Sequence, residues 1–171
     1  ILTHMRGRDQ TSWFPFARFI AESGYKVFTF DFRGYGKSTG IKDTRMDRDL
    51  EAAIAYMRAK GAQQVVLIGA SMGGTAVIEL ASESQVQGVA ALSPPAEFGR
   101  INALTAVESM VIPLLLIVSE NDYQYYSDAR KIESAAAATQ FLVVEGQQHG
   151  TNMIAEHRNE IFANLLACLL Y

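Results

Sequence analysis

The chain has 171 residues, of which 49% are hydrophobic, and its 15 basic and 18 acidic side chains give a formal net charge of −3. This length and composition predict a single domain over residues 1–171 with a substantial core. The charge balance indicates no binding of nucleic acid, and no apolar run approaches the ~20 residues of a membrane helix, so we expect neither partner. The one cysteine, Cys168, excludes an intrachain disulfide.

Short apolar runs occur along the whole chain and end in a polar residue or a glycine. Continuous apolar runs are typical of strands that are buried on both faces of a parallel sheet. We therefore predict strands at Ile1–His4, Tyr25–Asp31, Gln64–Gly69, Val86–Ser93, Pro113–Ser119 and Gln140–Val144.

Amphipathic stretches with apolar residues at three-to-four spacing separate these runs, which predicts helices between the strands. This alternation favours an α/β domain: a mostly parallel sheet of about six strands with helices on both faces. The predicted helices are Ser12–Ser23, Thr44–Gly61, Ser71–Ser84, Ser127–Ala138 and Asn152–Tyr171.

The amino terminus begins with Ile1, inside an apolar run rather than at a methionine. This suggests an incomplete amino terminus, and an upstream signal peptide stays an open alternative. Because no disulfide is needed, we take the cytoplasm as the default compartment.

The sequence Gly69-Ala70-Ser71-Met72-Gly73 lies between a predicted strand and a predicted helix. A Gly-x-Ser-x-Gly sequence in this position is typical of a tight turn that presents a nucleophilic serine at the carboxyl end of a sheet. A dinucleotide-binding loop would need a glycine where Ser71 stands. We therefore predict that Ser71 is a nucleophile.

A nucleophilic serine needs a general base and a carboxylate that orients the base. His149 follows the last predicted strand, and Asp122 follows the strand before it, so both should reach the carboxyl edge of the sheet. Glu120 and Asp128 are the nearest alternatives to Asp122. The chain order Ser71, Asp122, His149 is the order expected for a serine, acid and histidine triad on an α/β sheet.

The stretch Asp31–Ser38 ends in Gly36-Lys37-Ser38, which is like the end of a phosphate-binding loop. Such a loop needs a glycine at position 31, where Asp31 stands, and a helix should follow it. We therefore exclude a phosphate-binding loop here.

Taken together, the Gly-x-Ser-x-Gly turn, the Asp-x-Arg-Gly-x-Gly-x-Ser stretch from Asp31 and the acid-then-histidine order resemble the α/β-hydrolase superfamily. The small, lidless members that are esterase-like or dienelactone-hydrolase-like are the most similar. The resemblance implies that the backbone N–H groups of Met72 and Arg6 form an oxyanion hole. Met5 stands where the family often has glycine, so Met5 is an alternative to Arg6.

The resemblance also implies a fold that lacks the family's first two strands, which would expose the predicted strand Tyr25–Asp31 at a sheet edge and favour a homodimer. Dienelactone hydrolases usually have a cysteine nucleophile, whereas Ser71 favours general ester hydrolysis. The short segment Ala96–Ile112 leaves room for one short helix and predicts an open site. The walls of this site would come from Tyr35, Pro94, Phe98 and Tyr123.

The predicted function is therefore cleavage of small carboxylic esters through an acyl-enzyme, with no cofactor and no metal. Amidase, peptidase or thioesterase activity would use the same triad. A binding module without catalysis is the alternative from another class, because a fold does not fix a function. A nucleotide-dependent oxidoreductase is a third hypothesis, and it predicts binding of nicotinamide.

Overall fold

The computed structural model describes residues 1–81 and 85–169 and contains a six-stranded sheet in which every pairing is parallel. The sheet confirms the predicted α/β class and all six predicted strands, although the first two are short. In spatial order the strands are β2 (Thr29–Phe30), β1 (Leu2–Thr3), β3 (Val66–Ala70), β4 (Gly88–Leu92), β7 (Leu114–Ser119) and β8 (Thr139–Val144).

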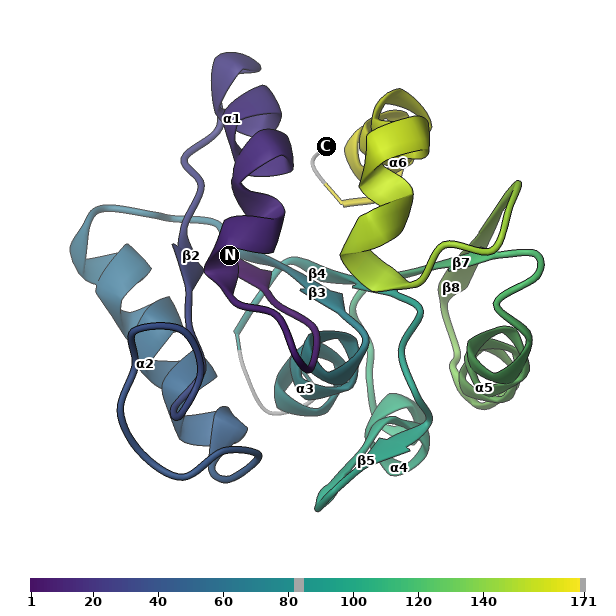
Figure 1. Ribbon diagram of the computed structural model, residues 1–171, viewed down its shortest axis with the longest axis horizontal. Coiled ribbons are helices and arrows are strands. Elements are labelled where there is room, and N and C mark those ends of the chain that lie inside the picture. The colour runs from purple at the N-terminus through teal and green to yellow at the C-terminus, as the bar shows by residue number, and fades with distance from the viewer. Residues whose placement is uncertain (82–84, 170–171) are drawn as a thin grey trace.

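Helices cover both faces of this sheet, as Figure 1 shows, with α1 and α6 on one face and α2 to α5 on the other. Their bounds are α1 (Phe14–Glu22), α2 (Met46–Ala59), α3 (Met72–Ala81), α4 (Ala103–Glu108), α5 (Tyr123–Ala135) and α6 (Ile154–Leu169), with short 3-10 helices η1 (Gln10–Trp13) and η2 (Gly150–Met153).

The central strands explain why continuous apolar runs predicted them. Every residue of β4 and β7 is buried, because helices pack on both of their faces. One core cluster, which includes Leu114 and Leu116, packs against the face that carries α2 to α5. Leu115 and Ile117 point the other way, into a second cluster with α1 and α6. The alternation of side chains along a strand produces these two layers.

Two expectations about element bounds need correction. Helix α5 begins at Tyr123 rather than Ser127, so Asp128 lies within the helix and not in its first turn. The predicted strand Tyr25–Asp31 is only Thr29–Phe30. The ends of the predicted helices at 82–84 and 170–171 lie outside the described residues.

The segment between β4 and β7 also differs from the prediction of one short helix. It contains α4 and, before it, a hairpin of two-residue strands, β5 (Glu97–Phe98) and β6 (Ile101–Asn102). Strands this short give no detectable alternation in the sequence. Within residues 1–81 and 85–169, no helix is long and apolar enough to cross a membrane.

Candidate active site

Ser71 lies at the sharp turn between β3 and α3, with a left-handed φ of +50°. The turn requires small neighbours, because a Cβ on Gly69 would lie 2.2 Å from the carbonyl oxygen of Gly73. A Cβ on Gly73 would lie 2.7 Å from the carbonyl oxygens of Thr3 and His4. The glycines therefore let the turn close on itself and let the start of α3 approach the end of β1.

The His149 imidazole contacts the Asp122 carboxylate, with 2.8 Å between Nδ1 and Oδ2. The two alternative acids are occupied elsewhere. Glu120 accepts hydrogen bonds from Asn121 and from the backbone of Gly146. Asp128 accepts one from the backbone of Ala96 and pairs with Lys131. Among the three carboxylates considered, Asp122 is therefore the one that reaches the histidine.

Two serine hydroxyls hold the loop that carries His149. The Ser93 hydroxyl, at the end of β4, accepts a hydrogen bond from the Gly150 N–H at 3.2 Å. The Ser119 hydroxyl, at the end of β7, donates to the carbonyl oxygen of Gln148 at 2.6 Å. Gly150 also packs against Ala70, since a Cβ built on Gly150 would lie 3.4 Å from the Ala70 Cβ. The histidine loop is thereby fixed beside the turn that carries the serine.

Tyr125, on the first turn of α5, packs against the imidazole of His149. The two ring centroids are 4.0 Å apart and the ring planes are inclined by 42°. The phenol ring therefore covers one side of the histidine, while Asp122 contacts its Nδ1.

The Ser71 hydroxyl makes no hydrogen bond to His149 within the part of the chain that the structure describes. Catalytic hydrogen bonds are often long in a free enzyme and shorten when substrate binds. Ser71 nevertheless occupies the start of α3, where its carbonyl accepts a hydrogen bond from the Thr75 N–H. The positive end of the helix dipole at this position favours negative charge.

The loop after β1 lies beside the same turn and begins with a buried histidine, His4. The backbone N–H of Phe32 donates to His4 Nε2 at 3.1 Å, so the ring proton is on Nδ1, which donates to the Met5 carbonyl oxygen at 2.9 Å. Burial lowers the pKa of His4 below its ordinary value of 6.5. His4 is therefore a neutral structural link between the loops of residues 4–9 and 31–38.

The predicted oxyanion residues lie on two sides of the serine. Met72 follows Ser71 in the turn, and Met5 and Arg6 follow His4 in the loop after β1. The Met5 sulfur accepts a hydrogen bond from the Thr151 hydroxyl at 3.4 Å, so this side chain also contacts the histidine loop. None of the three backbone N–H groups donates a hydrogen bond to another described residue.

The four predicted substrate contacts have different environments. Tyr35 and Pro94 are buried, whereas the Tyr123 side chain is 76% exposed. Phe98 is half-buried, with the Arg6 guanidinium 5.6 Å from the centre of its ring. Their contact with a substrate stays a prediction.

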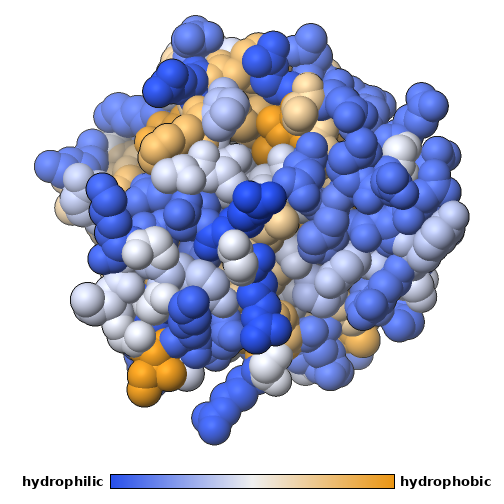
Figure 2. All heavy atoms as spheres, in the orientation of Figure 1, coloured by the Kyte–Doolittle hydropathy of each residue, from blue (hydrophilic) through white to orange (hydrophobic). Residues whose placement is uncertain are grey.

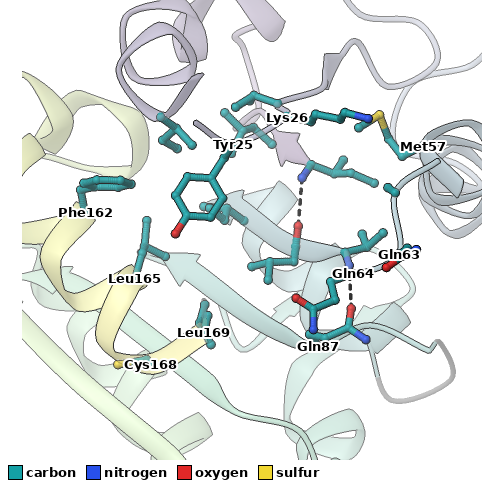
Figure 3. A pocket seen from close by; sticks show the side chains of 18 of the residues that line it. Tyr25, Lys26, Met57, Gln63, Gln64, Gln87, Phe162, Leu165, Cys168 and Leu169 are labelled. Carbon is teal, nitrogen blue, oxygen red and sulfur yellow. Dashed lines mark hydrogen bonds between the residues drawn. The ribbon is translucent and has the colours of Figure 1, made fainter. Parts of the chain in front are cut away.

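A pocket of about 520 Å³ lies at the opposite edge of the sheet, where the strands begin (Figure 3). Its walls include Tyr25, Phe162 and Leu165, and the amino end of β3 forms part of its floor. The lining contains none of Ser71, Asp122 and His149, so this pocket is not the site that the triad residues form.

Figure 2 shows a largely hydrophilic face with apolar side chains gathered over α1 and α6.

The described residues contain no group of three histidine, cysteine or acidic side chains that could hold a metal ion. Two residues that help to build the site were missed by sequence reasoning: Ser93 and Ser119. Each of them ends an apolar run, which is a detectable signal for a loop-anchoring hydroxyl. The contact of Tyr125 with His149 was not predicted either, because it depends on where α5 begins.

Comparison with known proteins identifies the family and the fold. The family model described as "alpha/beta hydrolase fold" matches residues 6–130. YfhR of Escherichia coli K12 is 28% identical over 96 residues, which cover 54% of this chain and 34% of YfhR. A 2-hydroxy-6-oxononadienedioate/2-hydroxy-6-oxononatrienedioate hydrolase of Klebsiella pneumoniae is 34% identical over 83 residues, which cover 46% of this chain and 29% of that protein. The match thus spans about a third of the length of these curated relatives.

The monoacylglycerol lipase of Paleococcus ferrophilus has the same fold, with a TM-score of 0.79, 16% identity, and coverage of 97% of this chain and 91% of the lipase. At this identity the likeness concerns the fold alone. The family match covers well over half of the chain and includes Ser71 and Asp122. The chain belongs to the alpha/beta hydrolase fold family.

Proposed function

We propose that the chain is a serine hydrolase that cleaves small carboxylic esters, with Ser71 as nucleophile, His149 as general base and Asp122 as the orienting acid. The observation that carries this proposal is the 2.8 Å contact between His149 Nδ1 and Asp122 Oδ2 at the sheet edge where Ser71 is presented. Because Asp122 accepts the Nδ1 proton, Nε2 is free to accept the proton of the serine hydroxyl.

In the proposed reaction, Ser71 Oγ attacks the ester carbonyl carbon while its proton moves to His149 Nε2. The backbone N–H of Met72, together with that of Arg6 or Met5, stabilises the negative oxygen of the tetrahedral intermediate. The intermediate collapses to an acyl-serine, and the alcohol leaves with the proton from His149. Water then attacks the acyl-serine and gives a proton to His149, and His149 passes this proton to Ser71 Oγ as the acid is released.

The preference for small esters is supported by the size of the segment that follows β4. This segment contains a hairpin of two-residue strands and the six-residue helix α4, which leaves little chain to enclose a long acyl group. The name of the Klebsiella pneumoniae hydrolase gives further support for hydrolysis, and the match covers 29% of that protein.

The test is hydrolysis of p-nitrophenyl esters of increasing acyl length by the wild type, by Ser71→Ala and by Ser134→Ala. Ser134 is an exposed serine on α5 whose hydroxyl bonds only within the helix, so its variant is the matched control. We expect Ser71→Ala alone to abolish hydrolysis and covalent labelling by a fluorophosphonate. A folded wild-type protein that neither hydrolyses any ester nor labels would favour the binding-module alternative. Labelling without ester hydrolysis would favour an amide or thioester substrate.

A further inference from the structure

A buried tyrosine and a carboxylate, both in the connection between β2 and α2, form a pair beside the serine turn. The Tyr35 hydroxyl donates to Asp43 Oδ1, and burial together with the Asp43 carboxylate raises the pKa of Tyr35 to about 12. Tyr35 therefore remains a proton donor throughout the physiological pH range. Asp43 has a left-handed φ of +57° in the loop before α2, a conformation that costs most residues free energy.

This pair contacts the side chains of two residues whose backbone N–H groups belong to the proposed oxyanion hole. Asp43 Oδ2 pairs with the Arg6 guanidinium at 3.4 Å. The Tyr35 hydroxyl oxygen lies 3.7 Å from the Met72 sulfur. Arg6 comes from the loop after β1 and Met72 from the start of α3, so one phenol–carboxylate pair connects the two halves of the hole.

The loop that carries Arg6 has little regular structure to hold it in place. The bond from the Arg8 N–H to the Met5 carbonyl, at 3.2 Å, is its one backbone hydrogen bond that begins and ends within residues 5–8. Gly7, with a φ of +75°, adds a flexible point next to Arg6. The ion pair to Asp43, the Phe98 ring beside the guanidinium and an interaction with the Tyr35 hydroxyl therefore restrain the Arg6 side chain.

We infer that Asp43 and Tyr35 are positioning residues that set the distance between the two oxyanion donors. The inference rests on the proposed function. Loss of the Asp43–Arg6 ion pair should affect rate rather than stability, because the Arg6 side chain is 67% exposed and surface ion pairs contribute little to stability. In contrast, a misplacement of about 1 Å at a reacting centre can cost roughly 100-fold in rate.

The experiment compares Asp43→Ala and Asp43→Asn with the wild type, with Asp47→Asn as the matched control. Asparagine tolerates the left-handed backbone and keeps an acceptor for Tyr35, but it loses the charge that pairs with Arg6. Asp47 is a half-buried carboxylate that also pairs with arginines, Arg45 and Arg48, but it lies on α2. We expect kcat on p-nitrophenyl acetate to fall by about 10- to 100-fold in Asp43→Ala and by less in Asp43→Asn, with KM nearly unchanged.

A second measurement does not depend on activity: NMR order parameters of the Arg6 and Met72 backbone amides in the wild type and in Asp43→Ala. We expect the Arg6 order parameter to fall and that of Met72 to change less, because α3 also holds Met72. Unchanged order parameters, or equal losses of kcat in Asp43→Ala and Asp47→Asn, would overturn the inference. A wild type without Ser71-dependent hydrolysis, combined with a loss of order at Arg6, would reject the proposed function and leave the positioning role in place.

Discussion

The left-handed backbone of Ser71 makes a sharp prediction about stability. A φ of +50° costs a residue with a Cβ roughly 1–2 kcal/mol, and glycine escapes this cost. Glycine in turn loses roughly 0.4–1 kcal/mol relative to alanine through the greater entropy of its unfolded chain. Because the backbone strain that glycine avoids exceeds its entropic cost, the free energy of unfolding of Ser71→Gly should be about 1 kcal/mol higher than that of Ser71→Ala. Ala52→Gly should have the opposite sign and lose about 1 kcal/mol, since Ala52 is exposed in the middle of α2.

Urea unfolding followed by circular dichroism measures these differences directly. Both variants at position 71 lack the hydroxyl, so their comparison isolates the backbone term from any effect of the lost oxygen. A Ser71→Gly variant that is no more stable than Ser71→Ala would mean that the turn does not strain the backbone at position 71.

Three more predictions concern the same region. Gly69→Ala should lower the free energy of unfolding by about 3 kcal/mol, because the added Cβ meets an immobile backbone oxygen. Gly74→Ala should cost much less in the same urea assay, because the nearest atom to its added Cβ is 3.2 Å away. Tyr125→Leu should lower kcat by about 2- to 12-fold, because it removes the ring that packs on His149. Tyr125→Phe keeps this ring and should retain the wild-type kcat. Burial lowers the pKa of His4 in the folded state, so the unfolded chain binds a proton at a higher pH than the folded chain does. The free energy of unfolding should therefore fall as the pH drops below about 6.5. In urea titrations from pH 7.5 to 5, His4→Gln should therefore lose less stability than the wild type.

The central strands and the serine turn could be predicted because their signals are local. The strand Leu114–Ser119 is apolar throughout, and this pattern follows from burial on both faces of a parallel sheet. The glycines around Ser71 are required by backbone contacts within a few residues. In both places the sequence pattern and its physical cause lie in the same short segment.

The choice of the acid and the loop contacts could not be predicted with the same precision. Three carboxylates follow β7, and only the path of the loop decides that Asp122 meets His149. The pair of Tyr35 and Asp43 depends on a left-handed backbone at a non-glycine residue, which composition does not reveal. Side-chain contacts within the loops, such as that of Tyr35 with Asp43, were therefore missed, whereas the elements that support the loops were found.

The serine hydroxyls at the ends of β4 and β7 have a consequence for the energetics of turnover. Ser93 and Ser119 order the histidine loop when the sheet forms, and ordering backbone costs about 1–2 kcal/mol per residue. That entropy is lost during folding, so the ordering of this loop would add nothing to the entropic cost of an acylation step at this site.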